Sequence, residues 1–403
     1  MDRVDVIFNT YVTNSLFKNK SVLQANYVPE AILHRSEQVE QIASVLAPAL
    51  RGEKVSNLFL YGKTGSGKTL SVQHVGDKLL EKVKQTGEEN LKFLYINCKL
   101  KKVADTEYRI IAELIKALKG SVPSTGLPTD VIYSKFMEMI DYKKQVIILV
   151  LDEIDQAVKK INDSFIYTLT RINSELKQAQ ICLIGISNSL TFMDNLDPRV
   201  RSSLGEEELI FPPYNALQLQ DILKERSNQA FKESILEEGV IAKCAAYAAR
   251  EHGDARRALD LLRVAGELAE REGNKNVILK HIDMANQKIE RDKMLDIIEN
   301  EPTQFQLVLY AIMKLSNNNK KSQEQIFTGD VYNKYTEICG NTKNEILTQR
   351  RVGDIIAEFD MLGIINAHVI SKGRHGRTRE IKLMLNSGVK EKANEILEKA
   401  LEP

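Results

Sequence analysis

The stretch "GKTGSGKT", Gly62 to Thr69, decides the fold class of this chain. It matches G-x-x-x-x-G-K-[ST], a pattern in which glycines let the backbone fold so that its N–H groups point inward at phosphate oxygens. An apolar run, "NLFLY", precedes it and a helical pattern follows, as a phosphate-binding loop requires. A chance glycine-rich turn is the alternative, and this context argues against it. The nucleotide-binding residues that we expect here are Gly62, Lys63, Thr64, Gly65, Ser66, Gly67, Lys68, Thr69 and Leu70.

Polar residues at two later strand ends complete the expected site. Lys68 should reach the β- and γ-phosphates and the hydroxyl of Thr69 should bind Mg²⁺, but hydrolysis also needs a carboxylate and a group that activates water. "VIILVLDEID" supplies Asp152 for Mg²⁺ and Glu153 for the water. "GISNS" ends the next strand with Asn188, which can hold the water or sense the γ-phosphate at the same sheet edge. Taken alone, the acidic pair also fits a solvated loop and Asn188 a turn.

Four short apolar runs in the first half alternate with helical patterns: "NLFLYG", "FLYINC", "VIILVLDE" and "ICLIGISN". This alternation predicts an α/β domain over residues 1–213, with a parallel sheet covered by helices on both faces. From 214 to 298 the strand patterns vanish, which indicates a small helical domain. The break "NEPTQ" then begins a third domain over 299–403. A chain of 403 residues is long enough for three domains.

The third domain combines three helical patterns with two strands. "TQFQLVLYAIMKLS" and "GDVYNKYTEICG" are the first two helices, and in "TQRRVGDIIAEFDMLG" Thr348 can cap the third and Gly363 can close it. Apolar residues share one face of this third helix: Val352, Ile355, Ile356, Phe359 and Leu362. The strands "IINAHVI" and "EIKLML" follow. Three helices and a β-hairpin make a winged helix-turn-helix.

The formal net charge is only +1, so a polyanionic partner has to meet a local patch of charge. "SKGRHGRTREIK", at the turn of the hairpin, is such a patch. A winged helix reads double-stranded DNA with its third helix in the major groove and its hairpin along the backbone or in the minor groove. A solvated turn or a protein partner is the alternative, and the histidine is a polar filler rather than a ligand. The expected DNA-binding set is Arg350, Arg351, Lys372, Gly373, Arg374, His375, Gly376, Arg377 and Arg379.

Two more arginine clusters stand outside these motifs. In "LDPRVRSSL", Arg199 and Arg201 follow a turn signal and can project toward a phosphate in a neighbouring subunit, although ordinary surface arginines fit as well. In "HGDARRALDLL", Asp254 caps a helix whose second and third residues are Arg256 and Arg257. Cations there oppose the helix dipole, so a nearby anion such as the nucleotide phosphate would explain them. A surface salt bridge is the alternative.

In this order, "GKTGSGKT", "LDEID", "GISN", "DPRVRSSL", "FPPY" and "GDARRALDLLR", followed by a winged helix, resemble the archaeal initiator proteins related to the origin recognition complex and the cell-division-cycle replication factor. The resemblance covers nearly the whole chain. It implies an AAA+ P-loop ATPase with a helical lid and a C-terminal winged helix, and ATP or ADP with Mg²⁺ as cofactors. It also implies binding to double-stranded origin DNA, help in recruiting or loading the replicative helicase, and paralogous initiator subunits as partners.

The resemblance further assigns roles to single residues around the nucleotide. Arg256 would be the sensor of the lid, and Arg199 or Arg201 the arginine finger that acts in trans. "YVPEAILHR" resembles the segment that lines the adenine pocket. This segment would place Val28, Pro29 and Arg35 near the base. We also expect Tyr214 of "FPPY" among the nucleotide-binding residues.

The family also carries an initiator-specific insertion that touches DNA. Here "DTEYRIIAELIKALKG" and "DVIYSKFMEMID" occupy its place between two strands, and Lys116 and Lys119 are suitably located. From the residues alone, a solvated helix with an apolar inner face is the alternative.

Turnover should be slow, because the family behaves as a switch in which the nucleotide sets the angle between sheet domain and lid. Two other functions stay open: a nucleotide-gated transcription regulator, and a clamp-loader-like AAA+ ATPase. The winged helix with its basic hairpin argues against the clamp loader.

The remaining features argue for an ordinary intracellular protein. Cys98, Cys182, Cys244 and Cys339 lie far apart without metal-ligand spacing, which predicts core thiols rather than a zinc site or disulfides. The N-terminus lacks the pattern of a signal peptide and no stretch is long and apolar enough to cross a bilayer. We expect a cytoplasmic, nucleoid-associated protein without membrane contact.

Overall fold

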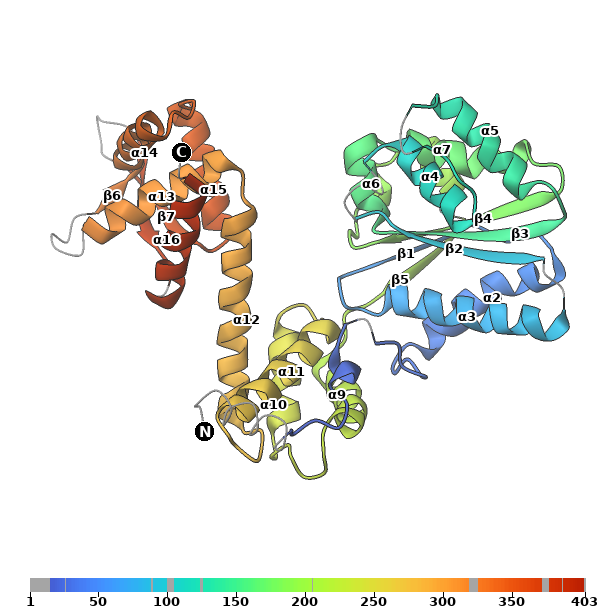
Figure 1. Ribbon diagram of the computed structural model, residues 1–403, viewed down its shortest axis with the longest axis horizontal. Helices are drawn as coiled ribbons and strands as arrows, with labels where there is room; N and C mark the ends of the chain where they lie inside the picture. The colour runs from blue at the N-terminus through green and yellow to red at the C-terminus, as the bar shows by residue number, and fades with distance from the viewer. Residues whose placement is uncertain are drawn as a thin grey trace, which may run out of the picture. The chain divides into compact units, whose positions relative to one another are not determined.

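The computed structural model describes residues 15–25, 27–87, 90–99, 105–123, 126–204, 206–318, 325–371, 377–385 and 387–401. The chain divides into two compact units, Met1–Ile282 and Asp283–Pro403, which are described separately (Figure 1).

A parallel sheet forms the centre of the first unit. Within the described residues it has five strands in the order β2-β3-β4-β1-β5, and neighbouring strands all run parallel. Their bounds are β1 Leu58–Gly62, β2 Leu91–Asn97, β3 Gln145–Asp152, β4 Ala179–Ser187 and β5 Glu207–Phe211. The first four were predicted. The fifth was not, because "EELIF" lies at the sheet edge, buries only its last residue fully and therefore lacks an apolar run.

Helices cover both faces of this sheet (Figure 1). On one face lie α2 Ser36–Leu46 and α3 Lys68–Thr86, and on the other α4 Glu107–Ala117, α5 Thr129–Ile140, α6 Ile154–Ile161 and α7 Ser164–Arg171. β3 is buried at every position because both of its faces are covered. Short helices complete the connections: η2 Ala47–Arg51, η3 Ile172–Ser174, η4 Met193–Asn195 and α8 Pro198–Leu204.

A helical lid follows the sheet. It contains α9 Ala216–Ala230, α10 Val240–Arg250, α11 Ala255–Arg271 and the start of α12 Leu279–Asn300. α11 begins as predicted, because the Asp254 side chain accepts hydrogen bonds from the N–H groups of Arg256 and Arg257.

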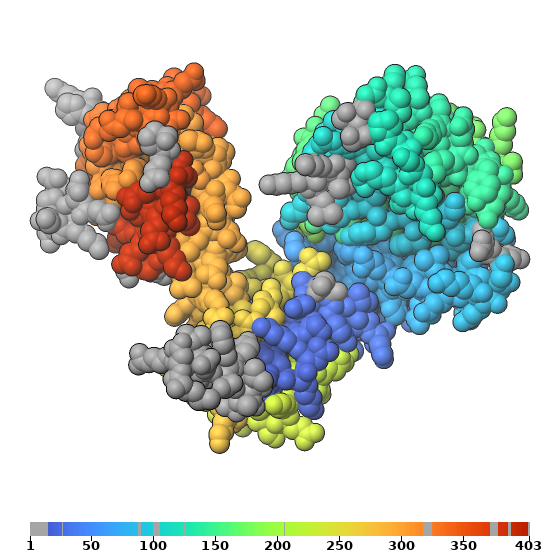
Figure 2. Space-filling model, in the orientation of Figure 1, coloured from blue at the N-terminus to red at the C-terminus, as the bar shows by residue number. Residues whose placement is uncertain are grey.

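The segment around η1, Lys20–Leu23, also packs on the lid, where Figure 2 shows it in dark blue. The ring of Phe17 packs against that of Phe231, tilted by 31° and with 4.5 Å between the centroids. The N–H of Leu16 donates to Glu270 Oε1 at 2.7 Å. The sequence analysis counted this segment with the sheet domain.

The second unit has the predicted winged-helix architecture. It contains the end of α12, α13 Thr303–Asn318, β6 Ile326–Phe327, α14 Thr328–Thr342, α15 Gln349–Met361, β7 Ile365–Ser371, β8 Arg377–Leu383 and α16 Ser387–Leu401. Its antiparallel sheet has the order β6-β8-β7. β6 and α16 were not foreseen from the sequence.

α15 agrees with the sequence pattern at both of its ends and along its buried face. The Thr348 side chain accepts from the N–H of Arg351, and Gly363 has a φ of 71°. Four of the five predicted core residues are fully buried: Val352, Ile355, Ile356 and Phe359. Leu362 was predicted to join them but is 40% exposed, because it stands at the C-cap where the helical face ends.

Candidate functional site

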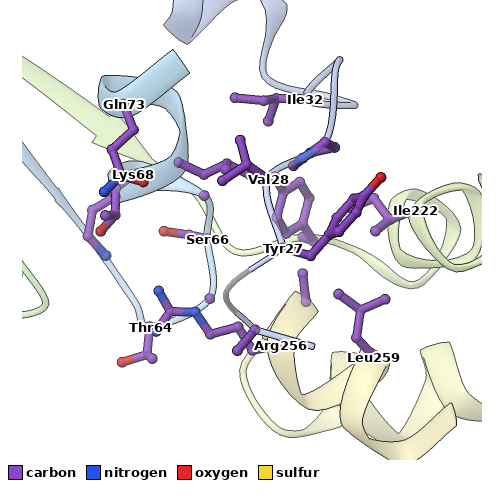
Figure 3. Close-up of a pocket in the computed structure, with 18 of the residues that line it drawn as sticks. Tyr27, Val28, Ile32, Thr64, Ser66, Lys68, Gln73, Ile222, Arg256 and Leu259 are labelled. Carbon is purple, nitrogen blue, oxygen red and sulfur yellow. The ribbon is translucent and has the colours of Figure 1, made fainter. Parts of the chain in front are cut away.

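One cavity of about 300 Å³ in the first unit joins three parts of the fold (Figure 3). The phosphate loop and the carboxyl ends of β2, β3 and β4 form its floor, and lid helices α9 and α11 form one wall with the segment before α2. It brings together most of the predicted nucleotide and catalytic residues: Val28, Pro29, Thr64, Gly65, Ser66, Gly67, Lys68, Thr69, Leu70, Asp152, Glu153, Asn188, Tyr214 and Arg256.

The loop takes a conformation that glycines make possible. Gly65 and Gly67 have φ angles of 71° and 96°, in the left-handed region that other residues adopt only at a cost. A Cβ on Gly65 would lie 1.8 Å from Asp254 Oδ1, and the carbonyl of Gly65 accepts from the N–H of Ala255 at 3.3 Å. The loop therefore docks directly on the first turn of lid helix α11.

Lys68 is buried beneath the loop, with only 4% of its surface exposed. Its ammonium donates to the carbonyls of Gly62 at 2.7 Å and Lys63 at 2.9 Å, and to Asn188 Oδ1 at 3.0 Å. Burial lowers the pKa of Lys68 to about 8, and the charge of Asp152 partly opposes this shift. A bound anion would stabilise the charged form, so this ammonium suits a phosphate.

The residues predicted to hold Mg²⁺ lie in contact. Thr69 Oγ1 donates to Asp152 Oδ2 at 2.8 Å, and Asp152 is buried. Among the described residues there is no group of three or more His, Cys, Asp or Glu side chains that could hold a metal ion. Mg²⁺ usually takes one or two carboxylates and completes its shell with water and substrate phosphates. One carboxylate and one hydroxyl beside a phosphate loop therefore fit this ion.

Glu153 stands at the turn between β3 and α6. Its φ of 53° places it in the left-handed region, which is uncommon for a residue with a side chain and recurs at functional sites. Its carboxylate lines the cavity and lies 3.7 Å from Lys99 Nζ. It is thus positioned to contact water in the cavity.

Asn188 follows β4 and faces Lys68. Its N–H lies 3.4 Å from Asp155 Oδ1, the oxygen that also accepts from the hydroxyl of Ser187 at 3.0 Å. Asp155 is buried, and through these two hydrogen bonds it holds the end of β4 beside the acidic pair. The sequence analysis did not assign it a role.

Toward the lid the cavity carries several apolar side chains, which suit a flat ring. Val28 and Ile32, from the segment before α2, line it together with Ile222 of α9 and Leu259 of α11 (Figure 3). Tyr27 is fixed beside them, because its hydroxyl donates to Gln229 Oε1 at 3.0 Å.

Arg35 was predicted to lie near the nucleotide base, but it does not line the cavity. It is 2% exposed and donates to the carbonyls of His34, Ser66 and Pro212. Its guanidinium carbon lies 3.8 Å from the ring centroid of Tyr214. Arg35 therefore holds the phosphate loop and Tyr214 in place from behind.

The three predicted trans-acting and sensor arginines separate in space. Arg256 lines the cavity, and in Figure 3 its side chain reaches from α11 toward the loop at Thr64 and Ser66. Arg199 and Arg201 lie outside the cavity lining and are 73% and 53% exposed. They pair with acidic neighbours, Asp197 at 3.0 Å and Asp194 at 3.4 Å. Of these three arginines, only Arg256 can reach a nucleotide in this cavity.

In the second unit, the predicted DNA-binding residues are described only in part. Arg350 and Arg351 are exposed in the first turn of α15. Arg379 instead donates to the carbonyl of Gly353 and so ties β8 to α15. Outside the described residues lie Lys372, Gly373, Arg374, His375 and Gly376, together with the side chain of Arg377.

Lys116 stands in the last turn of α4 and Lys119 two residues after its end, and both are exposed. Lys116 pairs with Glu113 at 2.6 Å. The opposite face of α4 is buried in the core, as an apolar inner face predicts.

Sequence reasoning missed polar residues at the end of β2. Tyr95, Asn97 and Lys99 all line the cavity. Tyr95 and Asn97 occupy alternate positions of β2, so one face of the strand carries both, and Lys99 lies two residues after the strand ends. This alternation next to an expected sheet edge was the signal that would have found them.

The prediction of core thiols is confirmed, because all four cysteines are buried and free. None of the described helices has the length and apolar character that a membrane span needs.

Three family models match successive parts of the chain. They are an AAA domain over residues 52–193, a Cdc6 AAA+ ATPase-type lid domain over 220–287 and a CDC6 C-terminal winged helix domain over 296–393.

Similar proteins and a similar structure span nearly the whole chain. The ORC1-type DNA replication protein 1 of Methanosarcina mazei is 51% identical, over 92% of this chain and 88% of the relative. The ORC1-type DNA replication protein of Pyrococcus abyssi is 52% identical, over 91% and 87%. The Aeropyrum pernix ORC1 protein, solved in complex with DNA, superposes with a TM-score of 0.82 at 42% identity and covers 95% of this chain and 97% of that one.

Proposed function

Because the chain belongs to the ORC1-type family of DNA replication proteins, whose AAA+ domain is of the ATPase class, we propose that it is an ATP-dependent initiator of replication. In this proposal it binds double-stranded origin DNA through its winged helix and AAA+ domain. It then helps to recruit or load the replicative helicase, beside paralogous initiator subunits. The domains that carry these roles are residues 1–213, 214–298 and 299–403.

The observation that carries the proposal is one cavity that holds the phosphate loop, the acidic pair and the lid arginine together. ATP would lie with its phosphates on the loop from Gly62 to Thr69 and its adenine between Val28, Pro29 and the lid. Thr69 and Asp152 would hold Mg²⁺, which when bound neutralises charge on the phosphates.

Hydrolysis needs a base, a fixed water and stabilisation of negative charge. Glu153 would accept the proton of the attacking water, and Asn188, already bonded to Lys68, would orient that water. Lys68 and Arg256 would stabilise the negative charge that shifts between phosphate oxygens. Arg199 or Arg201 would act on the nucleotide of a neighbouring subunit, since neither lines the cavity of its own chain.

The docking of the loop on α11 supports a switch. Asp254 and Ala255 contact Gly65 directly, so any shift of the loop on nucleotide binding or hydrolysis acts on the lid. We infer that the nucleotide sets the angle between sheet domain and lid, and that turnover is slow.

DNA binding is supported by the arginines at the start of α15 and by the DNA in the Aeropyrum pernix structure. Cations at a helix N-terminus oppose the helix dipole and are stabilised by phosphates or guanine. Arg350 and Arg351 would enter the major groove, the basic hairpin would contact the backbone, and Lys116 and Lys119 would add contacts from the AAA+ domain.

The test measures binding of the full chain to labelled chromosomal fragments, with ATP, ADP or no nucleotide, over a range of salt concentrations. Changing Arg350 and Arg351 to Ala should flatten the log–log salt slope by about 1.8, or about 0.9 for each phosphate that the variant no longer neutralises. Arg51→Ala is the control, because Arg51 is an exposed arginine of the first unit, paired with Glu53 at 3.0 Å.

Two results would contradict the proposal. An unchanged slope in the double variant would remove α15 from the DNA interface. Footprints at promoters rather than at origins would favour the transcription regulator.

A further inference from the structure

The carboxylate of Asp152 has a second hydroxyl partner. Tyr95, from the neighbouring strand β2, donates its phenolic hydroxyl to Asp152 Oδ2 at 2.6 Å. This is shorter than the 2.8 Å bond from Thr69 to the same oxygen. Tyr95 also lines the cavity, so its hydroxyl lies at the site and not in the core behind it. The phosphate-loop motif contains no such residue.

The parallel register brings the two side chains together. β2 and β3 pair so that Tyr95 lies opposite Val150, and Asn97 lies opposite Asp152. A tyrosine two positions before the residue opposite Asp152 lies on the same face and is long enough to reach its carboxylate diagonally. This reach across strands depends on tertiary pairing, because 57 positions separate the two residues in the chain.

The hydrogen bonds leave the carboxylate little freedom. Oδ2 accepts from Thr69 and Tyr95, and Oδ1 accepts from the N–H of Glu153 at 2.9 Å. An ionised carboxylate offers about four acceptor positions, so about one is left for a further ligand. The three donors come from α3, β2 and the β3–α6 turn, and together they prevent rotation of the carboxylate.

We propose that Tyr95 is a positioning residue, which orients Asp152 so that its remaining acceptor position would be available to a metal ion bound in the cavity. This rests on the proposed function, in which Asp152 holds Mg²⁺. Partners that orient a metal ligand are worth about 10- to 100-fold in metal affinity or activity. Tyr95→Phe keeps the ring and removes only the hydroxyl, so it should raise the Mg²⁺ concentration needed for half-saturation by about that factor.

The experiment titrates Mg²⁺ into the full chain with a fluorescent ATP analogue held below its dissociation constant, and reads the rise in the bound fraction of the analogue, not hydrolysis. Tyr95→Phe should need more Mg²⁺, while its nucleotide affinity in EDTA stays as in the wild type. Excess Mg²⁺ should restore both tight binding and the rate of hydrolysis. A merely structural role would lower the thermal midpoint without moving the Mg²⁺ titration.

Tyr61→Phe is the matched control. Tyr61 lies on strand β1 of the same sheet, and its hydroxyl also donates to a carboxylate, Glu208 Oε2, at 3.0 Å. Unlike Tyr95, Tyr61 does not line the cavity. Its Mg²⁺ titration should match that of the wild type.

The outcomes separate the inference from the proposed function. If Mg²⁺ improves nucleotide binding in the wild type and Tyr95→Phe responds at the same concentration, the positioning role of Tyr95 is refuted. If Tyr95→Phe lowers the nucleotide affinity in EDTA as much as it does with Mg²⁺, the hydroxyl serves the nucleotide or the fold rather than the metal. That result also refutes the positioning role. If the wild type binds no nucleotide with or without Mg²⁺, the proposed function itself fails.

Discussion

Raising the pH from 7 to 9 should weaken nucleotide binding, because Lys68 loses its charge in the protein without bound phosphate. Burial lowers its pKa to about 8. A bound phosphate stabilises the ammonium and raises that pKa again, so above pH 8 the complex holds more protons than the free protein. By linkage, affinity is constant below about pH 8 and falls as the pH rises above it.

The magnitude follows from the pKa. At pH 9 about one-tenth of the free protein carries a charged Lys68, so the dissociation constant should be about tenfold larger than at pH 7. Other groups do not account for such a change. Nucleotide phosphates titrate near pH 6, no histidine lines the cavity in the described residues, and burial raises the pKa of Cys98 to about 12.

The loss of the Lys68 proton does not itself destabilise the fold in this window. The ordinary pKa of lysine, 10.5, applies to the unfolded chain, so between pH 8 and 10.5 the unfolded state binds more protons. The contribution of Lys68 to stability therefore rises with pH in that range.

Isothermal titration calorimetry in buffers of different ionisation enthalpy measures both the dissociation constant and the number of protons taken up on binding. Binding should take up about 0.9 proton at pH 9 and about 0.1 at pH 7. In Lys68→Ala, binding should be far weaker and carry no such uptake. The reasoning is refuted if the wild type binds equally well at both pH values, or if it binds more weakly at pH 9 without taking up a proton.

Three other changes test separate parts of the molecule. Glu153→Gln should bind ATP normally but hydrolyse it about 100- to 10,000-fold more slowly, since only the general base is lost; normal turnover in a phosphate-release assay would eliminate Glu153 as the base. Asp254→Ala should lower the free energy of unfolding by about 1 kcal/mol through loss of the α11 cap, measured by urea denaturation. Phe359→Ala should destabilise the second unit by about 3–5 kcal/mol, because the ring is fully buried, and a smaller loss would mean that the core collapses around the gap.

Local patterns predicted much of the fold and of the site. A glycine-rich loop after a strand, an acidic pair at a strand end and a capping Asp254 each act over a few neighbouring residues, so sequence spacing is enough to find them. The same holds for the buried face of α15, where helical periodicity selected four core residues and failed only at Leu362, beyond the last turn.

Contacts between distant segments could not be predicted in this way. Arg35 is a charged residue of the segment expected at the base, yet it is buried behind the phosphate loop, where it donates to the carbonyls of Ser66 and Pro212. The packing of Phe17 on Phe231 likewise joins the N-terminal segment to the lid.

The amino-acid sequence by itself determined that this protein has a phosphate-binding loop on a parallel sheet, a helical lid and a winged helix, since each follows from local spacing and periodicity. Only the tertiary structure decided which side chains complete the site. Tyr95 reaches Asp152 because two parallel strands pair in one register, and Gly65 meets Asp254 because the lid folds back on the loop. Such pairings depend on non-local packing, and no short stretch of sequence contains them.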